Sequence, residues 1–234
     1  MIAQAFGIDP TGLPEFGPRY NIAPSQDIPV VRVAAEGGRM PVRELVLVRW
    51  GLIPGWAGEP DIGLHTINAR CETADTKPAF RASFKRRRCL VPADGFYEWK
   101  AMPGGKKQPY HITARPASGM APSPTLFAMA GLWDRWEPKE GGAAIESCTI
   151  LTTAANDFMA GIHNRMPVIV RPEEWGRWLD PEEDPRRLKE LCRPYPAHLH
   201  AAMAVSRLVN SPRNETPLCL QPPEAEEPQH GLFD

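Results

Sequence analysis

The chain has 234 residues, of which 42% are apolar and 24% charged, the composition of a globular protein with one large domain or two small ones. Its 27 prolines are more than twice the average usage of about 5%. Prolines spread through apolar segments mark turns and edge strands and argue against a long helical bundle. The formal charge is −1, but the tail 222–234 holds four acidic residues and no Lys or Arg, so the body carries +3. This balance permits an anionic partner without requiring one.

The five cysteines are scattered and form no C-x-x-C pair, so neither a disulfide framework nor a zinc site is predicted. A reducing cytosol is the expected compartment. No segment approaches the roughly 20 apolar residues of a membrane span. The start of the chain lacks the basic region of a signal peptide and reaches Asp9-Pro10 early. We therefore expect a cytoplasmic protein that contacts no membrane.

Strand patterns predominate along the chain. Runs of β-branched or alternating apolar residues between Pro and Gly predict strands at 28–33, 43–52, 89–99, 127–136, 147–152 and 166–170. The helices are predicted to be few and short, at 77–88, 153–161, 172–179 and 185–192. In the first of these, Phe80 and Phe84 share one face and cations follow at the C-terminal end. Pro172 suits the first turn of the third helix.

The predicted strands do not alternate regularly with long helices, which argues against a doubly wound parallel sheet. No internal repeat and no linker divides the chain. We predict an α+β protein, a single domain over residues 1–221 with a curved mixed β-sheet or barrel-like core and a few short peripheral helices. An acidic, disordered tail is expected at 222–234.

The motifs of phosphate loops, zinc proteases, hydrolase elbows and dinucleotide sites are missing. Three segments instead place polar groups among apolar residues, at 67–73, 91–100 and 161–168. They contain an amide at Asn68, a carboxyl at Glu98 and an imidazole at His163, which together suit general acid–base chemistry. Glu98 lies between two aromatic residues, so desolvation is expected to raise its pKa. Taken singly, each of these residues is more often a capping, packing or solvent-facing residue.

Taken together, the motifs are recognisable. They are RYNIAP at 19–24, RWGLIP at 49–54, INARCET at 67–73, CLVPADGFYEW at 89–99, ILTT at 150–153, IHNRMP at 162–167 and VSRLVN at 205–210. In this order they resemble the SOS response-associated peptidase (SRAP) family, whose members crosslink to abasic sites in single-stranded DNA. The resemblance runs through nearly the whole chain.

The resemblance implies roles for particular residues. Asn68 would position the sugar and the N-terminus, Glu98 would shuttle protons during ring opening and Schiff-base chemistry, and His163 would assist aldehyde formation and its reversal. An electropositive groove that also includes the basic run 85–88 is expected. Trp56 would be a wedge or a stacking surface for unpaired bases, and the arginines would contact phosphates. The residues expected to bind DNA are Arg70, Arg165, Trp56 and Asn21.

The chain departs from the family at the nucleophile. Family members begin Met-Cys-Gly-Arg, and the thiol and α-amine of that cysteine capture the ring-opened aldehyde as a thiazolidine. Here residue 2 is Ile2, and Ile2-Ala3-Gln4 reads as the continuation of a first strand. We interpret Cys71, Cys89 and Cys148 as core residues. Two explanations stay open: the natural start carries the cysteine, or this member reacts through its α-amine by a Schiff base, which supports β-elimination but no thiazolidine.

The sequence thus predicts an abasic-site-processing protein that reacts through its N-terminus, as a lyase or crosslinking enzyme. Its expected partner is single-stranded DNA or a single-strand/double-strand junction that carries an abasic site. One alternative is a DNA-damage-binding module without chemistry, and a second is an autoprocessing peptidase. No metal, organic cofactor or obligatory protein partner is implied.

Overall fold

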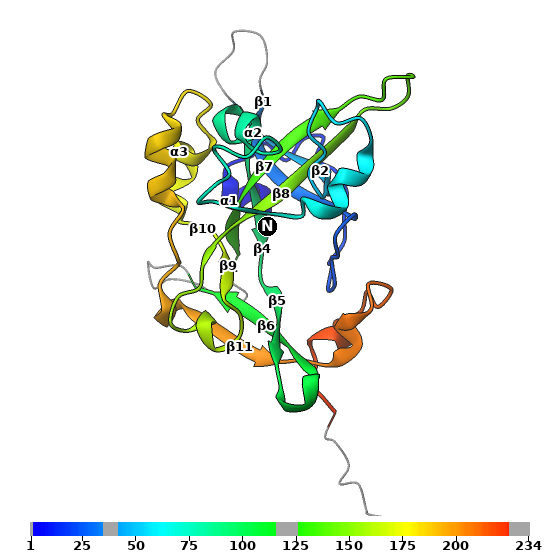
Figure 1. Ribbon diagram of the computed structural model, residues 1–234, viewed down its shortest axis with the longest axis vertical. Helices are drawn as coiled ribbons and strands as arrows, with labels where there is room; N and C mark the ends of the chain where they lie inside the picture. The colour runs from blue at the N-terminus through cyan, green and yellow to red at the C-terminus, as the bar shows by residue number, and fades with distance from the viewer. Residues whose placement is uncertain (1, 35–41, 116–125, 225–234) are drawn as a thin grey trace, which may run out of the picture.

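A computed structural model describes residues 2–34, 42–115 and 126–224. Its larger sheet has the strand order β10-β7-β4-β1-β2-β8-β3, with β9 beside β8. Because β7 also pairs with β8, the five strands β7, β4, β1, β2 and β8 close into a barrel (Figure 1). The strands of this sheet are β1 (Asp27–Ala34), β2 (Val42–Trp50), β3 (Asn68–Arg70), β4 (Arg88–Ala93), β7 (Phe127–Trp136), β8 (Ile145–Ala154), β9 (Arg165–Pro167) and β10 (Ile169–Val170).

A second sheet lies below the barrel in Figure 1 and has the order β11-β6-β5. Its antiparallel strands are β5 (Phe96–Ala101), β6 (Lys107–Ala114) and β11 (His200–Ala204). The chain passes from the barrel to this sheet through Asp94 and Gly95. A Cβ at Gly95 would lie 1.9 Å from Nε2 of His111, so only glycine allows β5 to turn this closely onto β6.

Every second residue of each barrel strand points inward. Most of these residues are apolar, so the barrel has an apolar interior. The inward positions include Val30, Val48, Cys89, Met129 and Cys148. At one end the same alternation brings Arg32 inside, where it donates to Glu44 (2.6 Å) and Glu146 (3.0 Å) and lies over the ring of Trp133. This ion cluster closes one end of the barrel, and the other end faces the second sheet.

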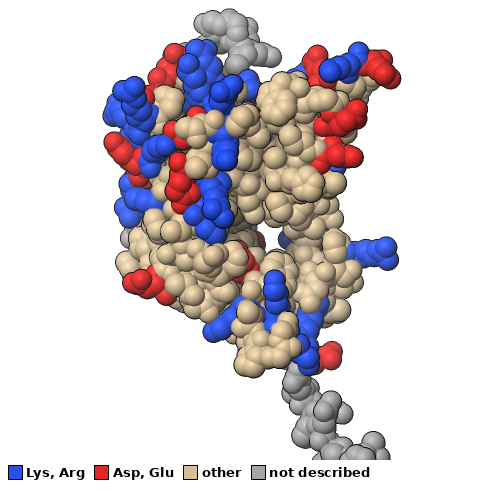
Figure 2. All heavy atoms as spheres, viewed as in Figure 1, with Lys and Arg blue, Asp and Glu red and all other residues tan. Residues whose placement is uncertain are grey.

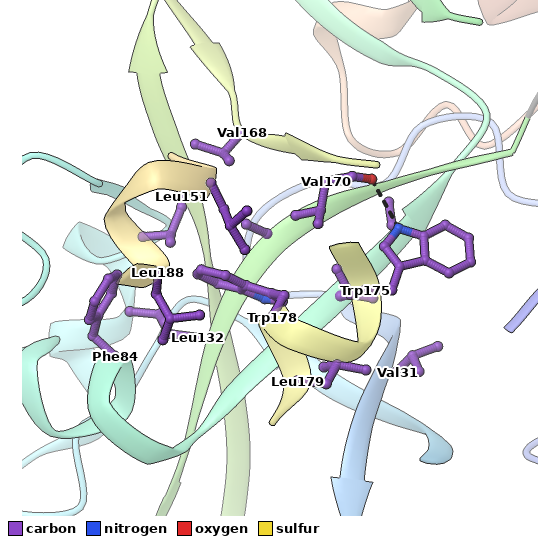
Figure 3. Packing of buried hydrophobic residues seen from close by; sticks show 14 of the residues in the cluster. Val31, Phe84, Leu132, Leu151, Val168, Val170, Trp175, Trp178, Leu179 and Leu188 are labelled. Carbon is purple, nitrogen blue, oxygen red and sulfur yellow. Dashed lines mark hydrogen bonds between the residues drawn. The ribbon is translucent and has the colours of Figure 1, made fainter. Parts of the chain in front are cut away.

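Short helices cover the outer face of the barrel. They are α1 (Ile2–Phe6), α2 (Arg81–Arg86), α3 (Trp175–Leu179) and α4 (Pro185–Leu188). Figure 3 shows Trp178 of α3 packed between the strands, Phe84 of α2 and Leu188 of α4. Its indole nitrogen donates to the carbonyl of Cys89 (2.8 Å), while that of Trp175 donates to Val170 (2.9 Å). The short 3₁₀ turns are η1 (Pro60–His65), η2 (Pro103–Gly105), η3 (Met159–Gly161), η4 (Pro172–Glu174), η5 (Lys189–Leu191), η6 (Ala197–Leu199), η7 (Arg207–Asn210) and η8 (Pro217–Leu220).

The predicted single α+β domain with a barrel-like core is confirmed, and β7 has the predicted bounds. The helix predicted at 153–161 is wrong: β8 continues to Ala154, where it pairs with β9, and only η3 follows. Of the helix predicted at 77–88, only α2 forms, because Arg88 already begins β4. Residues 2–4 lie in the helix α1, not in a strand. Strands β3, β6 and β11 were not predicted.

The tail predicted at 222–234 falls mostly outside the described residues, so the proposed domain boundary stays a prediction. Within the described ranges, no helix combines the length and the apolar character that crossing a membrane requires.

Candidate active site

A cavity of about 1630 Å³ lies between the open end of the barrel and the second sheet. Figure 2 shows the molecule hollowed at this level, with an opening between its upper and lower parts. Apolar residues of the barrel mouth, among them Ile28, Val91 and Ile150, line its inner wall. All of the predicted site residues except Trp56 line the cavity, namely Asn21, Asn68, Arg70, Glu98, His163 and Arg165.

The strand β3 presents Asn68 and Arg70 side by side at the cavity. It pairs in parallel with β8, with Asn68 opposite Ile150. Alternation buries Ala69 and leaves Asn68 and Arg70 exposed on the same face. The indole nitrogen of Trp50 donates to the carbonyl of Ile67 (2.8 Å), which fixes the chain just before this strand.

Glu98 and His163 form the central pair of the site. Oε1 of Glu98 lies 3.7 Å from Nδ1 of His163, at ion-pair distance. Burial raises the pKa of the Glu98 carboxyl above its usual value, although His163, the N–H of Trp99 and Lys107 oppose this rise. A carboxyl with a raised pKa beside an exposed imidazole is an arrangement suited to proton transfer.

His163 is held by the tight turn that ends η3. Its backbone N–H donates to the carbonyl of Met159 (2.8 Å), and Nδ1 accepts from the N–H of Arg165 at 3.2 Å. Asn156 stabilises the turn from below, because its Oδ1 accepts from the N–H of Met159 and its Nδ2 donates to Tyr195. The ring therefore faces the cavity from a constrained backbone.

Arg165, predicted to contact a phosphate, is paired within the protein. Its two terminal nitrogens donate to the carboxylate of Glu72 at 2.7 and 2.9 Å, and one also donates to the carbonyl of Thr152 at 2.6 Å. The hydrogen bonds from Arg165 lower the pKa of the Glu72 carboxyl. The guanidinium is thus held in one orientation at the edge of the cavity, and its contact with DNA stays a prediction.

Asn21 is buried and joins the segment at residues 19–24 to the C-terminal segment. Its amide nitrogen donates to three backbone carbonyls, those of Val209, Ser211 and Asn214, at 2.9–3.2 Å. Glu215 accepts from the backbone N–H groups of Tyr20 and Asn21 and from the side chain of Arg19. These contacts tie the lip of the cavity to the C-terminal segment, and a direct contact between Asn21 and DNA stays a prediction.

Two predicted parts of the groove lie elsewhere. Trp56 is 62% exposed and packs beside Pro78 and Arg81, outside the cavity lining. Arg88 is buried and donates to four backbone carbonyls, including those of Trp178 and Phe84, so its inclusion in the groove was wrong. In Figure 2, Lys and Arg side chains gather over the part of the molecule that carries α2 and α3.

The N-terminal segment reaches the cavity, because Ile2 and Ala3 line it. The helix α1 is anchored by Phe6, which stacks on Trp175 with ring centroids 4.1 Å apart. No serine or cysteine is among the described lining residues. Cys71, Cys89 and Cys148 are buried, as predicted.

Some lining residues were not identified from the sequence. His111 and Trp99 line the cavity, and burial lowers the pKa of His111. His111 lies in a strand that was not predicted, whereas Trp99 stands in a quoted motif without an assigned role. In the described part of the chain, no three His, Cys, Asp or Glu side chains are grouped to hold a metal ion.

Comparisons with known proteins agree with this geometry. The family described as SOS response associated peptidase (SRAP) matches residues 1–212. The chain is 43% identical over 220 residues to the "Abasic site processing protein YoqW" of Bacillus subtilis, with 92% of each chain covered. It is 37% identical over 225 residues to the "Abasic site processing protein HMCES" of Xenopus tropicalis, covering 88% of this chain and 66% of that one.

Solved structures share the fold. A protein from Bacteroides thetaiotaomicron superposes with a TM-score of 0.72 and 30% identity, covering 85% of this chain and 82% of that one. A phage-related protein of Bordetella bronchiseptica gives a TM-score of 0.65 at 27% identity, covering 88% of this chain and 89% of that one. On its sequence, its barrel and the residues around its cavity, this chain belongs to the SOS response associated peptidase family.

Proposed function

We propose that this protein processes abasic sites in DNA, with the deoxyribose bound in the cavity between the barrel and the second sheet. The observation that carries the proposal is the Glu98–His163 pair, 3.7 Å apart, beside Asn68 and Arg70 in one cavity. The relatives named above as abasic site processing proteins support the same substrate. We place the reaction in the cytoplasm, on single-stranded DNA or at a junction with duplex.

Each cavity residue has a defined part in the proposed reaction. Protonated Glu98 donates to the ring oxygen as the C1′–O4′ bond breaks, while a proton leaves the C1′ hydroxyl and an aldehyde forms. His163 exchanges protons with the same oxygen, and the Asn68 amide orients the sugar. Arg70 holds a flanking phosphate, since a guanidinium matches phosphate oxygens in geometry and charge.

The N-terminal segment supplies the nucleophile in this proposal, because Ile2 and Ala3 line the cavity. The α-amine attacks the aldehyde carbon, and the carbinolamine loses water to give an imine. Removal of a C2′ proton then expels the 3′-phosphate by β-elimination. A thiol on the same residue, as the family's N-terminal cysteine carries it, would instead trap the imine as a thiazolidine.

The test is the intact mass of the protein after incubation with a single-stranded oligonucleotide that carries one abasic site. An adduct seen only after borohydride reduction, and mapped to the N-terminal peptide, is the expected result. A stable adduct without reductant would refute the amine, and tight binding with no adduct would make the protein a non-covalent damage reader. His163→Gln should slow adduct formation, whereas His65→Gln, at an exposed histidine outside the cavity lining, should not.

A further inference from the structure

Two cysteines that are 121 positions apart in the sequence meet behind β3. Sγ of Cys71 donates to the backbone carbonyl of Cys192 at 3.6 Å, and the hydroxyl of Thr153 donates to the same carbonyl at 3.4 Å. The thiol of Cys71 therefore lies directly against the main chain of Cys192. Cys71 directly follows the last residue of β3, and Cys192 directly follows η5.

One member of this pair differs from the remaining cysteines in accessibility. Cys192 is partly exposed, whereas Cys71, Cys89, Cys148 and Cys219 are buried. Because Cys192 reaches the surface, a small oxidant can approach the pair from solvent. The barrel interior that surrounds Cys89 and Cys148 offers no such approach.

The pair is also electronically asymmetric. The side chain of Cys192 lowers the pKa of Cys71, and Thr153 and Arg165 add to the lowering, although burial and the charge of Glu72 oppose it. The side chain of Cys71, together with burial, raises the pKa of Cys192. By contrast, burial raises the pKa of both Cys89 and Cys148. One thiolate-prone sulfur next to a protonated thiol is the arrangement that thiol oxidation followed by disulfide closure requires.

We propose that Cys71 and Cys192 form a redox-active pair that closes to a disulfide when the protein meets hydrogen peroxide. The Cys71 thiolate attacks one peroxide oxygen, the O–O bond breaks, and the leaving hydroxide takes a proton to become water. The sulfur of Cys192 then displaces the hydroxyl of the Cys71 sulfenic acid, which leaves as water with the thiol proton. The two sulfurs lose two electrons in total, and the peroxide is reduced to two molecules of water.

The bond would tie the segment that carries Asn68 and Arg70 to the helical segment before Cys192. Cys71 also precedes Glu72, whose carboxylate holds Arg165. Oxidation would therefore fix one edge of the cavity to the outer layer of the fold. This inference stands on the cysteine geometry alone and does not depend on the proposed DNA chemistry.

The experiment is peptide mapping of the full chain after brief treatment with hydrogen peroxide, alkylation of the remaining thiols and digestion with trypsin. Lys77 and Arg193 are followed by proline, so the relevant peptides span residues 71–81 and 190–207. We expect them joined and two hydrogens lighter than their sum, separated again by dithiothreitol, with the free thiol count reduced from five to three.

Two variants sharpen the result. Cys192→Ser should abolish the joined peptide and leave Cys71 to oxidise further to sulfinic acid, whereas Cys219→Ser should leave the joined peptide unchanged. The proposal fails if peroxide converts Cys192 of the unsubstituted chain to sulfinic acid while Cys71 stays reduced. It also fails if the only disulfides found join separate molecules. Both of these outcomes are measured on the unsubstituted chain, so they test the proposal even if a variant does not fold.

Discussion

Arg165 directs both of its terminal nitrogens at the carboxylate of Glu72, at 2.7 and 2.9 Å, from a position 93 residues further along the chain. An internal carboxylate therefore occupies the face of the guanidinium that a DNA phosphate would use. The carbonyl of Thr152 accepts a further hydrogen bond from Arg165 at 2.6 Å, so the side chain stays anchored even without Glu72.

Glu72→Gln should therefore strengthen binding to single-stranded DNA. The substitution removes one negative charge that lies near both Arg165 and Arg70, an effect of about 1 kcal/mol or roughly fivefold in affinity at low salt. Fluorescence anisotropy with a labelled oligonucleotide measures it. Glu137→Gln, which breaks an exposed pair with Arg135, is the matched control and should change nothing. Weaker binding by Glu72→Gln would show that Glu72 positions Arg165 for DNA rather than competing with it.

Affinity for single-stranded DNA should fall steeply with salt, and Arg70 should account for part of that slope. Neutralising one phosphate contributes about 0.7 to the slope of log K against log salt for a single strand, so Arg70→Ala should reduce the slope by about this amount. Lys85→Ala is a suitable comparison, because Lys85 is an exposed cation of α2 that does not line the cavity. An equal reduction in both variants would place the DNA over α2 as well.

Glu98→Gln should abolish most of the activity without weakening the fold. Loss of a general acid–base group lowers a rate by about 10²–10⁴-fold, which the rate of borohydride-trapped adduct formation reports. Burial raises the pKa of Glu98 above 4.5, so the folded state binds the proton more tightly than the unfolded state. The stability that Glu98 contributes is thus present at low pH and lost as pH rises through the folded pKa.

The glutamine of the Glu98→Gln variant carries no charge. This variant should therefore have a melting temperature equal to or above that of the unsubstituted protein at pH 7. The advantage should vanish near pH 4. A variant clearly less stable at pH 7 would mean that the ionised carboxylate stabilises the site, in conflict with the direction of its pKa.

Phe6→Ala tests whether α1 positions the nucleophile, because it should displace the N-terminal segment and leave the rest of the site in place. Phe6 is buried and stacked on Trp175, so truncation should lower the free energy of unfolding by about 3–5 kcal/mol. Because α1 carries Ile2 and Ala3 to the cavity, adduct formation should slow while affinity for DNA stays within twofold. Ile8→Ala, which removes a buried side chain outside α1, controls for stability alone. Equal rates in both variants would mean that α1 does not position the nucleophile.

Glu215→Gln should destabilise the protein in a pH-dependent manner. Partial burial raises the pKa of Glu215, but the N–H groups of Tyr20 and Asn21 and the side chain of Arg19 outweigh it, so the pKa is lowered from 4.5. The stabilisation is therefore present above pH 4.5 and lost as pH falls through the folded pKa. We expect a loss of about 1–2 kcal/mol at pH 7, and denaturant unfolding should show the two proteins converging below pH 4. A constant difference across pH would exclude the ionised carboxylate as the cause.

Much of the barrel could be predicted from the sequence, because a short and nearly continuous apolar run such as that of β7 is typical of a strand that is buried on both faces. The break between β4 and β5 could not. It depends on Gly95 lying against His111, a contact with a residue sixteen positions away. The helix predicted at 153–161 was wrong for a related reason, because pairing of Thr153 with Met166 extends β8 beyond its local pattern.

The site likewise has residues that the sequence could identify and residues that it could not. Motifs identified Asn68, Glu98 and His163, and the structure brings all three to one cavity. The partners that fix their surroundings, such as Glu72 on Arg165 and Cys192 beside Cys71, lie 93 and 121 residues away in sequence. No local pattern links such pairs, because each belongs to a different element and meets its partner only through the tertiary fold.

The contacts of Asn21 and Glu215 affect the order in which the protein can fold during its synthesis. Residues 19–21, at the lip of the cavity, are fixed by groups 188 to 196 positions later in the chain. A ribosome therefore releases nearly the whole polypeptide before this lip has its partners. The barrel strands, with a core of their own, can associate earlier during synthesis, whereas the lip of the cavity takes its final form only after residues 209–215 have been made.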